Sequence, residues 1–240
     1  MPSINTNYGA AIALQSLNKT NAQLETTQNR INTGMKVSSA KDNGAIFAIA
    51  TSQRASMTAQ DAVRNSLQRG QSIIDVALAA GDTITAALEE QKALAVNIAS
   101  STGTAQAAYL ADYNALGTEI ANALSGASFD SVNLFAATTT SAITVQTGTG
   151  TSYTLKAAST AATTVATTTA ASAADAATLS ATVDGAITAF TAVLADFGTK
   201  AKSVGRSITF VNKLQDALEA GVGNLVDADL AKESARLTAL

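Results

Sequence analysis

The 240-residue chain contains no cysteine, histidine or tryptophan, and its single proline is Pro2. Without cysteine or histidine it has no disulfide, no thiol or imidazole ligand for zinc, and no imidazole to relay protons. Because no proline follows residue 2, no helix need be interrupted by a missing amide hydrogen. Aromatic residues make up only 4% of the chain. These absences favour long helices stabilised by many small contacts over one thick core.

The chain also has no strong excess of positive or negative charge. The chain carries 15 basic and 18 acidic residues, a formal net charge of -3, without blocks of either sign. We therefore expect no nucleic-acid partner and no polybasic membrane anchor. The N-terminus has no cleaved-signal pattern, and we expect no window long enough to cross a membrane, hence no membrane insertion. Taken alone, these features indicate a cytoplasmic protein.

The apolar residues that are present recur with helical spacing. Residues 1–32 show a narrow apolar face, and residues 46–100, 104–125 and 175–220 continue the pattern at alternating steps of three and four. This heptad spacing keeps one seam of a helix against a partner over a long distance. The predicted fold is mainly α, an elongated bundle of long antiparallel helices that forms a coiled-coil-like rod.

The middle of the chain has a different character. Residues 129–156 contain the cluster F-D-S-V-N-L-F and two alternating runs separated by the glycines 148 and 150, which predicts a turn and a small β-hairpin. Residues 157–174 are nearly all Ala, Thr and Ser. Without large apolar side chains this stretch is expected to be a surface segment.

Two polar interruptions join the helical segments. In residues 33–45, Gly34 suits the left-handed end of a helix, and Ser39 with Asp42 resembles a capping box that opens the next helix. In residues 221–240, Gly221 and Gly223 are expected to weaken the end of the long helix. Asp227 and Asp229, which follow them, are expected to flank the start of another helix.

No catalytic motif emerges. Glu89 and Glu90 are adjacent, so on a helix they point about 100° apart and do not share a site. Gly34 with Lys36 and Lys41 lacks the spacing of a phosphate-binding loop. Serines are plentiful, but no histidine can activate one. The sequence predicts neither an enzyme nor a cofactor or metal site.

Four short motifs resemble the terminal signatures of bacterial flagellins, in particular the short alphaproteobacterial ones. They are S-I-N-T-N at 3–7, R-I-N-T-G at 30–34, S-A-K-D-N-G-A at 39–45 and V-D-A-D-L-A-K-E-S-A-R-L at 226–237. The resemblance implies a structural subunit of the flagellar filament that self-assembles for motility.

It further implies a division of the chain. Residues 1–32 form an inner-tube helix, 33–45 a spoke joint, 46–220 a rod domain, and 221–240 a second spoke and the start of a second inner helix. The implied spoke residues are Arg30, Gly34, Ser39, Lys41, Asp42, Asn43, Gly44, Asp227 and Asp229. The implied assembly residues of the inner helices are Leu14, Leu17, Leu24, Ile31, Leu230 and Leu237.

The resemblance also implies export through the flagellar type III channel without a cleaved signal peptide, which reverses the cytoplasmic interpretation. Expected partners are other flagellin subunits, an export chaperone and the filament cap protein. Flagellins continue a few tens of residues beyond E-S-A-R-L. The expectation is therefore a form that lacks most of the C-terminal inner helix and polymerises poorly.

Residues 88–97 align with the flagellin segment that the Toll-like flagellin receptor reads. The equivalent face holds Glu89, Glu90, Leu94 and Asn97. An arginine stands at the position of Glu90 in recognised flagellins, so the charge is reversed and weak or absent receptor recognition is expected.

Two alternatives stay open at this point. A hook-filament junction protein shares the terminal helices, although it generally lacks so complete an S-A-K-D-N-G-A joint. A surface adhesin on the same scaffold would hold polysaccharide, and it needs exposed aromatic platforms. The few Tyr and Phe residues here fall mostly on helical seams or in the 129–135 turn.

Overall fold

The computed structural model describes residues 7–135, 143–148, 150–155, 158, 165, 168 and 171–240. The chain forms two compact units, a terminal unit of residues 1–59 and 213–240 and a central unit of residues 60–212. Two long helices, α2 (Gly44–Ser100) and α5 (Leu179–Val226), contribute residues to both. The prediction of a mainly α fold with a small β region is confirmed.

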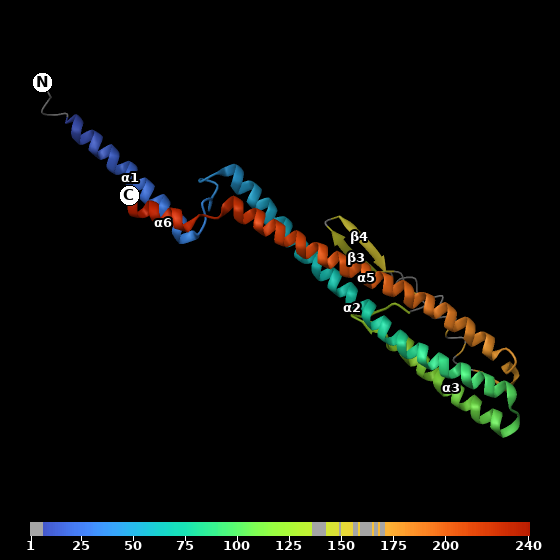
Figure 1. Ribbon diagram of the computed structural model, residues 1–240. Coiled ribbons are helices and arrows are strands. Elements are labelled where there is room, and N and C mark those ends of the chain that lie inside the picture. Colours follow the sequence, from blue (N-terminus) through green and yellow to red (C-terminus); the bar gives the residue numbers. More distant parts are fainter. Residues whose placement is uncertain are drawn as a thin grey trace. The chain divides into compact units, whose positions relative to one another are not determined.

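The terminal unit contains α1 (Tyr8–Thr33) and α6 (Leu230–Ala239), together with one end of α2 and one end of α5. The side chain of Asn7 caps α1 by accepting a hydrogen bond from the Ala10 amide at 3.2 Å. Figure 1 shows α6 (red) beside the C-terminal part of α1 (blue), where the Arg30 side chain reaches Glu233.

The central unit is a helical bundle of α2, α3 (Gly103–Gly126) and α5 (Figure 1). Lys92 of α2 forms an ion pair with Asp184 of α5 at 2.6 Å, whereas Gly81, further back in α2, faces Leu194 further on in α5. The two helices are therefore antiparallel, as expected. Gln91 likewise donates a hydrogen bond to the carbonyl of Tyr113, so α3 returns along α2.

The core of the central unit concentrates the few aromatic residues. The ring of Phe135 packs against those of Phe190 and Phe197, with centroids 5.4 and 5.8 Å apart. Tyr113 is fully buried, its hydroxyl has no hydrogen-bond partner among the described residues, and burial raises its pKa to about 12. The aliphatic members come from the heptad seams: Leu67, Ile74, Ile84 and Leu88 in α2, Ile120 in α3 and Val204 in α5.

Two glycines of α2 allow close packing. A Cβ at Gly70 would lie 2.7 Å from Cγ2 of Val145, and a Cβ at Gly81 would overlap Cδ2 of Leu194. The side chains of Val145 and Leu194 therefore approach the α2 backbone more closely than a Cβ at either position would permit.

The β region consists of two hairpins. The first pairs β1 (Ser128–Phe129) with β2 (Val132–Asn133), and Asp130 and Ser131 at its turn have positive φ angles of 50° and 62°. The second pairs β3 (Ile143–Gly148) antiparallel with β4 (Thr151–Leu155), with a register shift between Gln146 and Gly148. It lies on the bundle through Val145, and the Gln146 amide donates to Ser66 Oγ.

The expectation for residues 157–174 needs correction where the structure describes them. Most of this segment lies outside the described residues, but Val165 and Thr168 are fully buried rather than on the surface. Val165 joins the main core, and the carbonyl of Thr168 accepts a hydrogen bond from Gln91. The Val165 side chain and the backbone of Thr168 therefore lie inside the central unit, with the Thr168 carbonyl satisfied by a hydrogen bond.

Helix α5 also differs from its expected bounds. It begins at Leu179, after a short 3-10 helix, η2 (Ala173–Asp175), and it runs to Val226 instead of stopping at 220. Each helical glycine costs about 1 kcal/mol relative to alanine. The burial of Val222 and Val226 offsets the cost of Gly221 and Gly223, because a buried valine contributes a comparable or larger amount.

A second correction concerns the expectation that no segment is long and apolar enough to cross a membrane. Contrary to the expectation from the sequence, α5 is long and apolar enough to cross a membrane by length and composition alone. A core helix of a soluble bundle passes the same test. In α5 the large apolar residues Val183, Phe190 and Phe197 are buried, and 22% of the apolar window is buried.

We predict that Gly81→Ala destabilises the protein by ~1–3 kcal/mol relative to Gly198→Ala, because only the first new methyl group must displace a packed side chain. Both substitutions gain the same helix propensity, and a Cβ at Gly198 meets nothing within 4 Å. Urea unfolding of the two variants measures the difference. Equal midpoints would mean that Leu194 repacks without cost.

Candidate functional site

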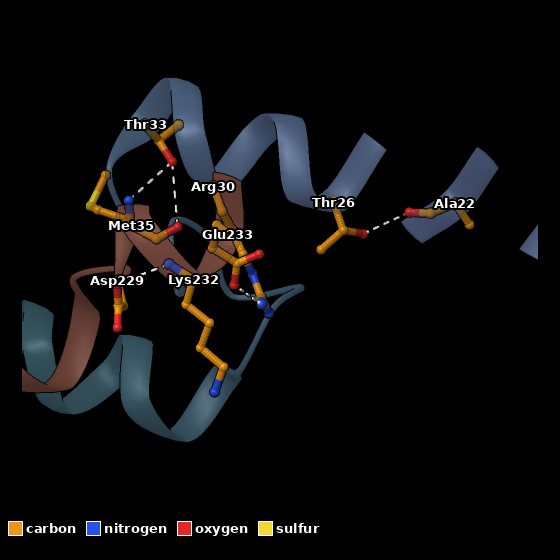
Figure 2. Close-up of polar contacts among 8 residues, drawn as sticks. All are labelled: Ala22, Thr26, Arg30, Thr33, Met35, Asp229, Lys232 and Glu233. Atoms are coloured by element: carbon orange, nitrogen blue, oxygen red, sulfur yellow. Dashed lines mark hydrogen bonds and ion pairs between the residues drawn. The ribbon is translucent and has the colours of Figure 1, made fainter. Parts of the chain in front are cut away.

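The segment between α1 and α2 starts with a residue in the left-handed backbone conformation. α1 ends at Thr33, and Gly34 follows with φ 70°, the conformation that glycine adopts most readily. The Thr33 hydroxyl donates to the carbonyl of Asn29 at 2.7 Å, and the Met35 amide donates to that hydroxyl at 3.3 Å. Figure 2 shows these Thr33–Met35 contacts at the end of α1. The chain thus leaves the helix in a defined direction.

This segment pairs with the chain that follows α5. The amides of Lys36 and Val37 both donate to the carbonyl of Val226, at 2.7 and 3.3 Å, and the Ala228 amide donates to the carbonyl of Gly34 at 2.9 Å. Met35 and Asp227 form an antiparallel β-bridge. The two predicted joints are therefore brought together as two short strands of backbone.

An apolar cluster lies beside the paired backbone. Val37, Ala50, Val222 and Val226 are all at least nine-tenths buried, and Phe47 packs against them. The residues come from the joint, the start of α2 and the end of α5. Apolar burial and backbone hydrogen bonds therefore stabilise the same junction.

The turn before α2 is organised by Asp42. Its carboxylate accepts hydrogen bonds from the amides and hydroxyls of Ser38 and Ser39, at 2.9–3.1 Å. These bonds, the Ser39 amide first, lower the pKa of Asp42 below its usual value. The predicted capping role of Ser39 is wrong, because α2 begins at Gly44 and the side chain of Asn43 accepts from the Ile46 amide. Ser39 belongs to the preceding turn.

The start of α6 is capped as expected, since the side chain of Asp229 accepts a hydrogen bond from the Lys232 amide at 3.1 Å. One turn on, Glu233 is buried to 7% exposure and its Oε1 forms an ion pair with Arg30 at 2.9 Å (Figure 2). This pair joins α6 to α1. The other carboxylate oxygen of Glu233, Oε2, has no hydrogen-bond partner among the described residues.

The remaining spoke residues of the prediction, Lys41 and Gly44, are exposed. The predicted assembly residues fall into two groups. Leu24 and Ile31 are half-buried, whereas the others are largely exposed: Leu14 59%, Leu17 56%, Leu230 49% and Leu237 36%. Sequence reasoning missed two further exposed apolar residues of α1, Tyr8 at 83% and Ile12 at 57%. Both residues are apolar, which could have marked them in the sequence. They lie outside the narrow apolar face that was predicted for this helix.

The predicted receptor-equivalent residues lie on α2 in the central unit. Glu89, Glu90 and Asn97 are exposed, and Leu94 is half-buried. The two carboxylates face solvent on adjacent helix positions. Among the residues that the structure describes, no group of three acidic side chains is arranged to hold a metal ion.

Comparison with known proteins gives a consistent result. The model of the bacterial flagellin N-terminal helical region matches residues 4–140, and that of the C-terminal helical region matches residues 180–240. Flagellin FljN of Caulobacter vibrioides is 51% identical over 243 residues, which cover 99% of this chain and 89% of the relative. Flagellin FljM of the same organism is 49% identical with the same coverage. A flagellin of Brucella melitensis is 34% identical over 255 residues, covering 100% of this chain and 90% of the relative.

We predict that Asp42→Asn loosens the turn at 38–42 at neutral pH, because an amide oxygen is a weaker acceptor than a carboxylate for four donors. In the unchanged protein this stabilisation is complete above the usual carboxyl pKa of 3.8 and is lost as the pH falls through the lowered value. Amide chemical shifts of Ser38 and Ser39 report both effects. Asp216→Asn is the control, and shifts that respond equally to both substitutions would contradict the prediction.

Proposed function

This chain belongs to the bacterial flagellin family, and we propose that copies of it join through the terminal unit. It is a structural subunit of the extracellular flagellar filament, as the family and its named relatives indicate. The hook-filament junction and adhesin alternatives are not favoured, because the relatives are flagellins over nearly the whole chain. Its role in motility is mechanical rather than catalytic.

The exposed apolar surface of the two terminal helices carries the proposal. Leu14 and Leu17 on α1 and Leu230 on α6 are each about half exposed, with Tyr8 and Ile12 beyond them. Removing apolar surface from water is favourable by about 25 cal/mol per Å². Packing of these faces against neighbouring subunits supplies a driving force that a single chain leaves unused.

We assign the inner-tube role to α1 and α6, the spoke role to the paired backbone around Gly34 and Val226, and the rod role to residues 46–220. The backbone pairing of residues 34–37 with 226–228 supports this division, because it fixes how both terminal helices leave the junction. In this assignment Gly34, Asp42, Asn43 and Asp229 set the direction of α1 and α6 through their turn and cap hydrogen bonds.

The same family membership supports further proposals on partners and export. We propose that an export chaperone and the filament cap protein bind this chain, and that it leaves the cell through the flagellar type III channel without a cleaved signal peptide. The chain has no cysteine, so no disulfide obstructs passage of an unfolded chain through a channel. We propose no enzymatic activity, cofactor, nucleic-acid partner or membrane insertion.

The test of self-assembly is polymerisation of the purified chain followed by sedimentation and electron microscopy. We expect Leu14→Glu with Leu17→Glu to abolish filaments, since two buried carboxylates cannot be accommodated in an apolar interface. The conservative pair Leu14→Met with Leu17→Met is the control and should assemble to the same extent as the unchanged chain. Filaments of the glutamate variant equal to those of the unchanged chain would rule out the proposed interface.

We also propose that the Toll-like flagellin receptor recognises this chain weakly. Glu90 is exposed on α2 and stands where recognised flagellins carry an arginine. A receptor surface that complements a positive side chain would therefore face a negative one. Receptor-reporter cells should respond weakly to the unchanged chain and at least about tenfold more strongly to Glu90→Arg. Glu119→Arg on α3 is the control. A strong response to the unchanged chain would refute the proposal.

A further inference from the structure

A groove of about 310 Å³ opens between α2 and α5 on the central unit. Its lining residues are Asp82, Thr85, Ala86 and Glu89 from α2, and Thr191 and Leu194 from α5. A cavity of about 150 Å³ with apolar walls is large enough for a benzene ring. The groove therefore has room for one aromatic side chain and for parts of the residues that flank it.

Between its two acidic residues, the lining of the groove is small and largely apolar. Leu194 is half-buried and lies so close to α2 that a Cβ at Gly81 would overlap its Cδ2. The Thr85 hydroxyl donates to the carbonyl of Gly81 at 2.9 Å, so it needs no further partner. Ala86 adds only a methyl group. An apolar group can therefore enter without leaving these groups unsatisfied.

The two carboxylates of the groove have no partner among the described residues. Asp82 and Glu89 are exposed and lie seven residues apart, so they project from the same side of α2, about 10 Å apart along its axis. Neither forms an ion pair with a described residue. Lys92, one turn beyond Glu89, is held by Asp184 at 2.6 Å. The groove is therefore negatively charged at both ends.

A surface of complementary character lies further along α5. Phe210 is 62% exposed. Arg206 and Lys202 precede it by four and eight residues, so the three side chains lie within about 80° around the helix axis. Both cations are exposed, and neither forms an ion pair with a described residue. We call Lys202, Arg206 and Phe210 the α5 ridge, an aromatic ring beside two positive charges.

The groove and the α5 ridge cannot meet within one chain, although both belong to the central unit. Phe210 follows Leu194 by sixteen residues of the same helix, which separates them by about 24 Å along its axis. This distance is far longer than a phenylalanine side chain. Phe210 can therefore reach such a groove only on another copy.

We propose that Phe210 of one copy of this chain inserts into the groove of a second copy. Its flanking cations, Arg206 and Lys202, then face the two carboxylates of that groove. The proposal rests on the proposed function and names a contact between central units within it. Because different surfaces of the two copies meet, the interface is heterologous and can repeat from copy to copy along a filament.

The two parts of this contact act differently. Burial of the Phe210 ring removes apolar surface from water and supplies affinity. The opposed charges select the register, because a shifted ridge would lose its pairing with the carboxylates. Arg206 and Lys202 start about 6 Å apart along α5, and their long side chains can splay to reach carboxylates about 10 Å apart.

The test uses chemical cross-linking of the full chain, which has no cysteine of its own. Ala86→Cys places a thiol in the groove, and Thr209→Cys places one beside Phe210, both at exposed positions. Under polymerising conditions, a short bismaleimide should join this double-cysteine chain into dimers, trimers and longer products, because a heterologous contact repeats. Thr118→Cys with Thr209→Cys is the matched control and should give no such ladder, since Thr118 is exposed on α3 outside the groove.

Further substitutions in the double-cysteine chain test each part of the contact. Phe210→Ala should slow cross-linking at least about tenfold, because the contact loses its apolar anchor. Reversal of the groove pair, Asp82→Lys with Glu89→Lys, should slow it by at least as much, since like charges then meet. Reversal of the ridge pair, Lys202→Glu with Arg206→Glu, should do the same. With both pairs reversed together, cross-linking should recover, because opposite charges face each other again.

Asp112→Lys with Glu119→Lys is the matched charge control, because these exposed carboxylates also lie seven residues apart, on α3 outside the groove. Circular dichroism of each variant checks that its helices remain. The contact is overturned if no ladder forms, if Phe210→Ala and the single-pair reversals leave it unchanged, or if the combined reversal does not recover; the groove then takes another occupant. Electron microscopy of the unchanged chain tests the proposed function separately, since missing filaments reject that function while the ladder decides the contact.

Discussion

The carbonyl of Val226 accepts hydrogen bonds from the amides of Lys36 and Val37, and the arrangement of the terminal unit depends on this pairing. α6 has only ten residues, fewer than an isolated helix needs to persist in water. It is anchored at its start by backbone bonds to the Gly34 segment and one turn later by the Arg30–Glu233 pair. The neighbouring cluster around Val37 and Val222 excludes water from the junction, which strengthens these polar contacts.

The central unit is stabilised differently, through close packing of small residues. Where glycine stands on α2, Val145 and Leu194 come close to the helix backbone, so dispersion contacts accumulate despite the scarcity of large side chains. The rings of Phe135, Phe190 and Phe197 pack together in this core. A chain with so few aromatic residues thus places three of them together, and leucine, isoleucine and valine supply most of the remaining core.

A single copy leaves part of the terminal unit unsatisfied. Leucines on α1 and α6 remain exposed. In a filament subunit, burial of these apolar side chains against neighbouring subunits favours association. In the central unit, by contrast, the largest apolar side chains, such as Leu67, Ile74 and Phe190, are buried within one chain.

The sequence by itself determined the helical class, the approximate extent of the long helices and the family, because heptad spacing and terminal motifs are local patterns. It also indicated both joints and the cap at Asp229. It did not determine that Asn43 rather than Ser39 caps α2, that α5 passes through Gly221 and Gly223, or that Val165 is buried. Tertiary structure decided the last two points, because both depend on burial against residues distant in the chain. The cap at Asn43 is local, and the turn that Asp42 organises takes Ser39 away from the start of α2.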